Sequence, residues 1–340
     1  MMEIRGDLCH ELLVKTMDKK LAFCPTEEYA TWREKVKEKF CELLGMAEIK
    51  KNACPLKLTI ESEVQKEGYK QVRFVFESER GAFVPCYLLI PDTGKEKYPV
   101  AITLQGHSSG FHNSIGEPKE EEDNEYALGR GKFAVQAVQR GYAALAIEQR
   151  AMGERSTSRH IKGTCNFIAM SALLLGRTII GERVWDISRA IDALSIFKNL
   201  DLDKILITGN SGGGTASFYA ACFDERIKLV APSCSFCTYD SSILDIHHCP
   251  CNHIPNVRQW FDMGELSCLI APRSMIVIAG KEDDIFPIHG VEEAFAIVKE
   301  IYQAVGAKEN CRMEITPKGH WWCEDIVWNA IQEEVKNLGW

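Results

Sequence analysis

The sequence predicts an α/β fold in which helices cover both faces of a mostly parallel central sheet. From residue 99 onward, short and nearly continuous apolar runs alternate with helical stretches. Strands of a parallel sheet are apolar along their whole length because both of their faces are covered. Of the 340 residues, 46% are hydrophobic and 26% are charged, which is enough apolar material for a large core.

The apolar runs predict the strands of this sheet, and the segments between them predict its helices. The runs are VAITL (100–104), YAALAI (142–147), ILITG (205–209), LVAPSC (229–234), MIVIAG (275–280) and CRMEIT (311–316). Helices are expected over 130–140, 178–199, 213–222 and 288–305, with a last helix after His320.

The first part of the chain has a different texture. Residues 1–53 predict a helical extension that packs on a main domain of residues 54–340, because apolar side chains recur there at helical spacing (Trp32, Val36, Phe40, Leu43, Leu44). Three further runs alternate or run apolar and are separated by turn signals, which predicts an antiparallel meander (LKLTIESEV, KQVRFVFES and FVPCYLLIP). A connection rich in Cys, His and Pro, at about 235–270, is expected to be an insertion or lid.

Charge and cysteine usage exclude several classes of protein. A net charge of −8 and a pI near 5.7 argue against a nucleic-acid or membrane partner, which would need a basic face. The chain starts without the apolar core of a signal peptide, and no apolar run approaches the ~18 residues of a membrane span. Scattered thiols suit a reducing compartment, so a cytoplasmic protein is expected. A homo-oligomer is compatible with these features.

One short segment indicates a nucleophile. Ser211 lies in Gly209-Asn210-Ser211-Gly212-Gly213, directly between an apolar strand and a helix of small residues. A G-x-S-x-G sequence at such a junction lifts the serine Oγ above the sheet on a tight, strained turn. A phosphate-binding loop is the weaker interpretation, because a P-loop needs a lysine and a dinucleotide loop belongs to the first strand.

Candidate partners for this serine follow it in the order acid, then histidine. Asp283 follows the strand 275–280, and its spacing to Pro287 favours it over the adjacent Asp284 and Glu282. His320 is the only histidine after the strand 311–316. His320 would take the proton of Ser211, and Asp283 would hold the imidazole in the correct tautomer.

The same chemistry needs hydrogen-bond donors for an oxyanion. The backbone N–H of Gly212, next to the nucleophile, is one expected donor. The other is the backbone N–H of His107 in the segment LQGHSSG, which follows the strand 100–104.

With these segments the chain resembles the α/β-hydrolase superfamily, in particular its acetyl xylan esterase and cephalosporin deacetylase-like branch, near the dienelactone hydrolases. The resemblance rests on LQGHSSG, AIEQRAMGER, GNSGGG and GKEDDIFP with Gly319-His320, and covers about residues 80–340. The second segment resembles the D-x-R-G-x-G loop of that branch, with Ala151 in place of a glycine. Gly212 stands where the carbohydrate deacetylases usually have glutamine. The resemblance implies an α/β-hydrolase fold and a serine esterase that acts on small acyl groups.

The segment DIHHCPCNHIP (245–255) allows two interpretations. Cys249, Cys251 and His253, with His247 or His248, could ligate a metal. Their C-x-C spacing is unusual, however, so a loop that packs its thiols under the lid is favoured, and neither a metal nor a cofactor is expected.

Two other groups of residues receive an expected role. Trp260 and Trp321 flank the expected pocket and are candidates for contact with a sugar ring. The helix 178–199 and its flank carry charged residues that are expected to form a buried ion pair or a subunit contact, with Asp186 as a structural partner and not the acid of the triad (Arg177, Arg183, Asp186, Arg189).

Together these features predict a serine carboxylesterase that removes short acyl groups, acetyl first, from a small carbohydrate ester such as an acetylated oligosaccharide. The alternative is another activity of the same superfamily, such as that of a peptidase, thioesterase or dienelactone-type hydrolase. A metal-binding or non-catalytic protein that uses the His/Cys cluster at 247–253 is the remaining alternative.

Overall fold

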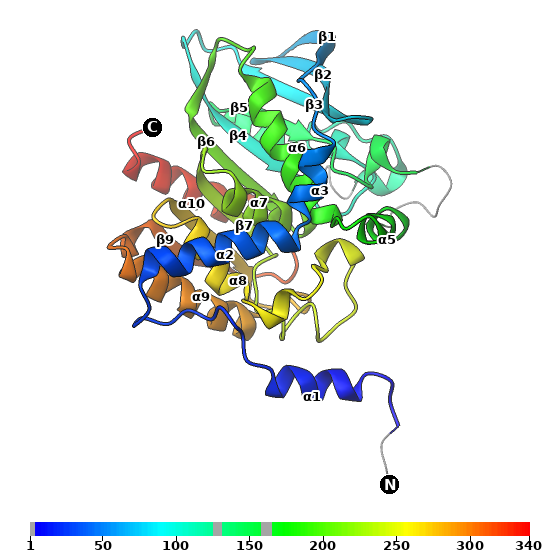
Figure 1. Ribbon diagram of the computed structural model, residues 1–340. Helices are drawn as coiled ribbons and strands as arrows, with labels where there is room; N and C mark the ends of the chain where they lie inside the picture. Colours follow the sequence, from blue (N-terminus) through cyan, green and yellow to red (C-terminus); the bar gives the residue numbers. More distant parts are fainter. Residues whose placement is uncertain (1–3, 125–130, 158–164) are drawn as a thin grey trace.

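The computed structural model describes residues 4–124, 131–157 and 165–340. Within them the chain builds a nine-stranded sheet with the order β1-β2-β3-β5-β4-β6-β7-β8-β9, and helices pack around it (Figure 1). The predicted α/β class with helices on both faces is confirmed.

The sheet has an antiparallel part and a parallel part. The expected antiparallel meander is present and consists of β1 (Leu58–Lys66), β2 (Tyr69–Glu79) and β3 (Ala82–Pro91). Strand β3 also pairs antiparallel with β5. All pairs from β5 to β9 are parallel. These strands are β4 (Tyr98–Leu104), β5 (Ala143–Ile147), β6 (Leu200–Asn210), β7 (Ile227–Ser233), β8 (Ser274–Gly280) and β9 (Cys311–Thr316).

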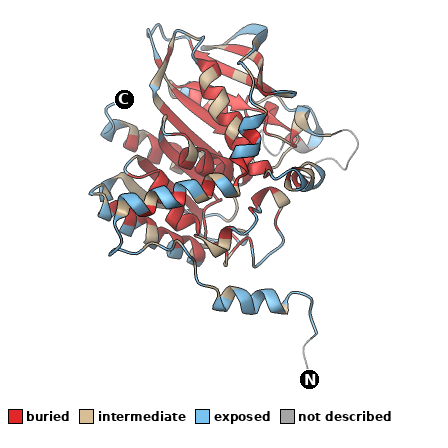
Figure 2. Ribbon diagram, in the orientation of Figure 1, coloured by how far each residue is buried: buried red, intermediate tan, exposed pale blue. Residues whose placement is uncertain are grey.

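Alternate residues of the parallel strands enter two separate cores. Ile205 and Ile207 of β6 pack on one face, whereas Leu206 packs on the other. The first face is covered by α6 (Ile179–Leu194), α7 (Gly212–Phe223) and α9 (Ile288–Ala304), and the second by α4 (Phe133–Gln139) and α10 (Glu324–Asn337). Figure 2 shows the central strands buried throughout, which explains why these strands read as continuous apolar runs.

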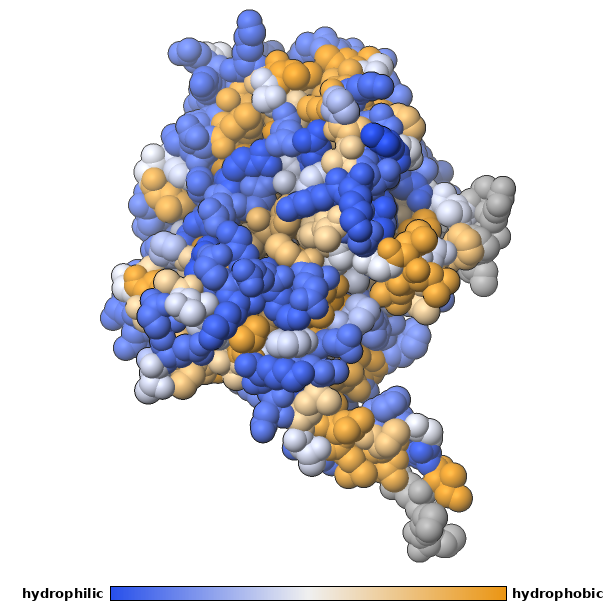
Figure 3. All heavy atoms as spheres, in the orientation of Figure 1, coloured by the Kyte–Doolittle hydropathy of each residue, from blue (hydrophilic) through white to orange (hydrophobic). Residues whose placement is uncertain are grey.

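The N-terminal helices differ in how firmly they pack. Side chains of α2 (Tyr29–Leu43) and α3 (Met46–Lys51) join the main core, among them Trp32, Phe40 and Ile49. In contrast, α1 (Leu8–Thr16) buries no residue and projects from the body of the molecule (Figures 1 and 3). The division into a helical extension (1–53) and a main domain (54–340) stays a prediction.

The connection between β7 and β8, called the insertion below, contains α8 (Met263–Leu266) and several short 3₁₀ helices. The short helices of the described residues are η1 (Phe111–Asn113), η2 (Glu121–Asp123), η4 (Gly153–Arg155), η5 (Pro250–Asn252), η6 (Val257–Gln259), η7 (Ser267–Leu269) and η8 (Lys308–Asn310).

Helix α5 (Asn166–Leu174) lies at the edge of the molecule and exposes Phe167, Met170 and Leu174, which form an apolar patch in Figure 3. Among the described residues, no helix combines the length and the apolar character that crossing a membrane requires.

Candidate active site

Ser211 occupies the sharp turn between β6 and α7. Its backbone has φ 55° and ψ −126°, a conformation that residues other than glycine rarely adopt. The backbone N–H of Ser211 donates to Ser233 O over 2.9 Å, which ties the turn to the end of β7. This strained strand-to-helix turn has the geometry of a nucleophile elbow.

Glycines let the elbow pack against β4. A Cβ on Gly213 would lie 2.6 Å from the carbonyl oxygen of Gln105 and would meet that of Leu104 more closely still. Gly209 faces the same Leu104 oxygen. Since real Cβ atoms do not approach backbone oxygens so closely, the sequence needs glycine on both sides of Ser211.

Asp283 and His320 are hydrogen-bonded. His320 Nδ1 lies 2.9 Å from Asp283 Oδ2, and the other oxygen, Oδ1, accepts the backbone N–H groups of Ile285 and Phe286. Burial acts to raise the pKa of Asp283, but the bond to His320 and the two N–H donors outweigh it and hold the pKa below its ordinary value. The structure thus pairs His320 with Asp283, whereas the competing Asp284 is exposed.

Ser211 and His320 line one cavity of about 280 Å³. The ring of Phe286 stacks on the imidazole, with centroids 5.9 Å apart. The other described residues that line the cavity are Gln105, Gly106, His107, Asn113, Gly131, Phe133, Asn210 and Ile285. Asn113 and Phe133 were not expected there, because nothing in their local sequence marks them as pocket residues.

Of the two expected oxyanion donors, His107 lines the same cavity, and Gly212 directly follows Ser211, which also lines it. Gly212 is the first residue of α7, and N–H groups of the first helical turn have no partner within their helix. The ring of His107 covers Gly212, so that a Cβ on Gly212 would lie 3.1 Å from His107 Cε1. A side chain at position 212 would therefore press on the ring of His107, which glycine avoids.

Glu148 supports the loop that carries His107. Its carboxyl group is fully buried and accepts hydrogen bonds of 3.2 Å from Gln105 Nε2 and from the backbone N–H groups of Phe111 and Glu154. Burial nevertheless raises the pKa of Glu148 to about 7. The segment AIEQRAMGER thus positions the loop that follows β4.

The buried ion pairing expected for α6 is present, but the arginines that bond Asp186 come from outside this helix and its flank. Arg150 bonds Glu79 (2.6 Å), Glu182 (3.0 Å) and Asp186 (2.8 Å), while Arg155 also bonds Asp186. The expectation that Asp186 is a structural partner is confirmed.

The two tryptophans expected at the substrate do not line the cavity of Ser211 among its described residues. Trp260 lies between the ammonium groups of Lys20 and Lys39, 4.5 and 4.1 Å from its ring centroid. Trp321 follows His320 and has Lys318 Nζ 4.7 Å from its ring. The prediction for Trp260 thus receives no support from the geometry, because its ring packs against the N-terminal segment.

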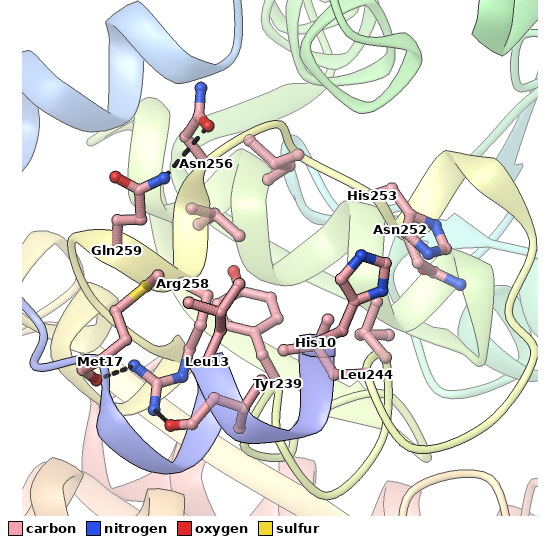
Figure 4. Close-up of a pocket in the computed structure, with 14 residues that line it drawn as sticks. His10, Leu13, Met17, Tyr239, Leu244, Asn252, His253, Asn256, Arg258 and Gln259 are labelled. Carbon is pink, nitrogen blue, oxygen red and sulfur yellow. Dashed lines mark hydrogen bonds between the residues drawn. The ribbon is translucent and has the colours of Figure 1, made fainter. Parts of the chain in front are cut away.

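The histidines expected to join Cys249 and Cys251 are dispersed. His248 is buried and lies 3.0 Å from Ser242 Oγ, whereas His247 is exposed. His253 lines a second, mainly apolar pocket of about 300 Å³ between α1 and the insertion (Figure 4), which shares no described lining residue with the cavity of Ser211. The two cysteines instead meet His107 and Cys165, a combination that sequence spacing did not reveal.

The elbow serine after β6 and the parallel sheet define an α/β-hydrolase fold. The sequence profile of the Abhydrolase family matches residues 6–226, and the chain belongs to this family. The protein named "Putative hydrolase YtaP" of Bacillus subtilis (strain 168) is 27% identical over 252 residues, which cover 73% of this chain and 81% of that protein.

Solved structures of esterases share the fold. A "putative acetyl xylan esterase (BF1801)" from Bacteroides fragilis NCTC 9343 superposes with a TM-score of 0.81 at 16% identity, covering 98% of this chain and 95% of its own. Acetyl xylan esterase 1 from Thermoanaerobacterium sp. JW/SL YS485 gives a TM-score of 0.62 at 17% identity, with 98% and 99% covered.

Proposed function

We propose that the protein is a serine carboxylesterase that hydrolyses short-chain acyl esters, acetyl esters first, of a small carbohydrate. The observation that carries this proposal is the hydrogen bond between His320 and the buried Asp283, at a cavity that Ser211 also lines. A buried carboxylate that orients a histidine beside an elbow serine is the arrangement used for acyl transfer.

In the first step, Ser211 Oγ attacks the ester carbonyl and His320 Nε2 takes its proton. Because Asp283 accepts from Nδ1, the imidazole keeps its lone pair on Nε2 and the positive charge formed there is stabilised. His320 then donates the proton to the leaving alcohol, and an acyl group remains on Ser211. Water, activated by the same histidine, hydrolyses this acyl-enzyme.

The tetrahedral intermediates carry a negative charge on the former carbonyl oxygen. The N–H groups of Gly212 and His107 are the donors that we assign to it, and one such donor typically contributes about 3 kcal/mol to stabilisation of the transition state. Glu148 serves this step indirectly, as it holds the backbone of the His107 loop through Gln105 and Phe111.

The size of the cavity and the relatives support a small substrate. At about 280 Å³, the cavity lies at the low end of ligand pockets, which favours a short acyl group. The structural neighbours named above are described as acetyl xylan esterases, and another is called a methylesterase. We therefore propose an acetylated oligosaccharide as the first substrate to test.

Turnover of a graded panel tests this function. We expect kcat/KM to fall from p-nitrophenyl acetate to butyrate to octanoate, and acetylated xylo-oligosaccharides to release acetate. A methyl glucuronate ester, an acyl thioester and a peptide amide belong in the same panel. A clear preference for any of these three over the acetyl esters would replace the proposed substrate class.

A further inference from the structure

Four ligand atoms from three distant segments converge beside the candidate active site. His107 Nε2 and the Sγ atoms of Cys165, Cys249 and Cys251 all lie within 4.8 Å of one another. The Nε2 atom is 3.2 Å from Cys251 Sγ and 3.6 Å from Cys165 Sγ. His107 follows β4, Cys165 precedes α5, and the other two cysteines belong to the insertion.

The two nitrogen–sulfur separations, 3.2 and 3.6 Å, lie within about 0.3 Å of those in a tetrahedral zinc centre. With Zn–S near 2.3 Å and Zn–N near 2.0 Å, a regular tetrahedron places its sulfurs about 3.8 Å apart and each sulfur about 3.5 Å from the nitrogen. We propose that His107, Cys165, Cys249 and Cys251 bind one Zn²⁺ ion in a Cys₃His site. This inference goes beyond the proposed esterase function and does not depend on it.

The charge around the cluster supports an anionic centre. A Zn²⁺ ion with three thiolates and a neutral imidazole carries one net negative charge. Arg183 is buried, and its Nη2 lies 3.2 Å from Cys165 Sγ. Its other hydrogen bonds reach the carbonyl oxygen of Arg150, and no carboxylate pairs with it in the described part of the chain. Because a buried cation needs a counter-charge, the zinc–thiolate centre is the partner that Arg183 otherwise lacks.

The ligand set indicates a structural site and selects zinc. Four protein ligands close the coordination sphere and leave no position for substrate, as in structural zinc centres. Thiolates with one imidazole favour zinc over the hard cations Mg²⁺ and Ca²⁺. A second group of possible metal ligands, Cys234, Asp283 and His320, also lies close together. It is not proposed as a metal site, because Asp283 and His320 bond each other directly.

Metal binding would connect the insertion to the candidate oxyanion hole. The ring of His107 packs on Gly212, and its backbone carries one of the assigned N–H donors. A zinc ion on Nε2 fixes that ring against the insertion and against the start of α5. The thiols release their protons when zinc binds, so that affinity falls as the pH is lowered.

Metal analysis of protein purified without a histidine tag, under reducing conditions, tests the site. Wild type is expected to contain about one zinc ion per chain, and Co²⁺ exchanged into it is expected to show the visible bands of tetrahedral cobalt and thiolate-to-cobalt charge transfer. Cys249→Ser with Cys251→Ser should lose both signals. Cys311→Ser is the matched control, since Cys311 is also partly buried but lies on β9, and it should keep both signals.

Several results would overturn the proposal. Reduced wild type that takes up neither zinc nor cobalt, or a double variant that binds as much metal as wild type, would do so. A disulfide between two of the cluster cysteines, found in peptide maps of the native protein, would also contradict the metal site, because disulfide sulfurs do not ligate zinc as thiolates. Ser211→Ala should bind zinc fully, so a failure of the esterase proposal is distinguishable from a failure of the metal site.

Discussion

His320 Nδ1 is bonded to Asp283 Oδ2 over 2.9 Å, while the residue after Asp283, Asp284, is exposed. Two adjacent aspartates thus have opposite environments, and exchanging each for asparagine separates their roles. Asp283→Asn is expected to lower kcat by about 10³- to 10⁴-fold, because asparagine would stabilise the wrong imidazole tautomer.

The same steady-state assay on Asp284→Asn provides the control. This variant should stay within about two-fold of wild type, as expected for a surface substitution. If Asp284→Asn were the more damaged variant, the assignment of the acid would have to be exchanged.

The close packing of Gly213, two residues after Ser211, leads to a second prediction. In Gly213→Ala the new methyl group meets the carbonyl oxygens of Leu104 and Gln105, so the turn must move. We expect kcat/KM to fall by about 100-fold or more, since a shift near 1 Å at a reacting group has an effect of this size. Gly6→Ala, whose added Cβ would meet nothing within 4 Å, should be unchanged. Equal activity of the two variants would contradict the described packing.

Because the carboxyl group of Glu148 is buried, we expect the free energy of unfolding of the protein to depend on pH. Burial raises the pKa of this group from 4.5 to about 7, so the native state keeps the proton after the unfolded chain has released it. The stabilising contribution is complete below pH 4.5 and is lost as the pH rises to about 7, by an amount on the order of 3 kcal/mol. Urea unfolding at several pH values measures it.

The reference for this experiment is Glu148→Gln, which cannot titrate. The free energy of unfolding of wild type should decline relative to that of Glu148→Gln between pH 4.5 and 7. A constant offset between the two curves would reflect hydrogen bonding alone and would show that Glu148 does not hold its proton in the native protein.

The ion network of Asp186 predicts a large effect on stability. Arg150 and Arg155 both bond this buried carboxylate, so Asp186→Asn removes the charge that the two guanidinium groups share, although Glu79 and Glu182 still pair with Arg150. The free energy of unfolding should fall by about 3–5 kcal/mol. Glu48→Gln, which removes the exposed pair with Lys51, should cost at most about 0.5 kcal/mol. Similar losses in the two variants would argue against a buried network.

The sequence predicted those parts of the site that depend on local structure. Ser211 was recognisable because an apolar strand, small residues and a helix follow each other directly around it. Asp283 and His320 were recognisable from their places after successive strands, since carboxyl ends of parallel strands meet at one edge of the sheet. The meander followed from the two-residue period of its strands and the helices from their 3.6-residue period, whereas the order of the strands in the sheet was not predicted.

Contacts between distant segments were beyond such reasoning. His107, Cys165 and Cys251 have no common spacing, and only the crossing of three loops brings them together. Trp260 was expected near the substrate because it belongs to the insertion, but its side chain packs on Lys20 and Lys39 instead. The sequence locates such a loop between two strands without indicating which way its side chains point.

Covalent labelling of Ser211 tests the central claim most directly. Wild type treated with a fluorophosphonate and digested should give one adduct on the peptide that contains Ser211, together with complete loss of p-nitrophenyl acetate hydrolysis. Ser211→Ala should remain folded, take up no label, and lose at least about 10³-fold in kcat. An unlabelled but folded wild type, or a Ser211→Ala variant that still turns over the ester at the wild-type rate, would contradict the assignment of Ser211 as the nucleophile.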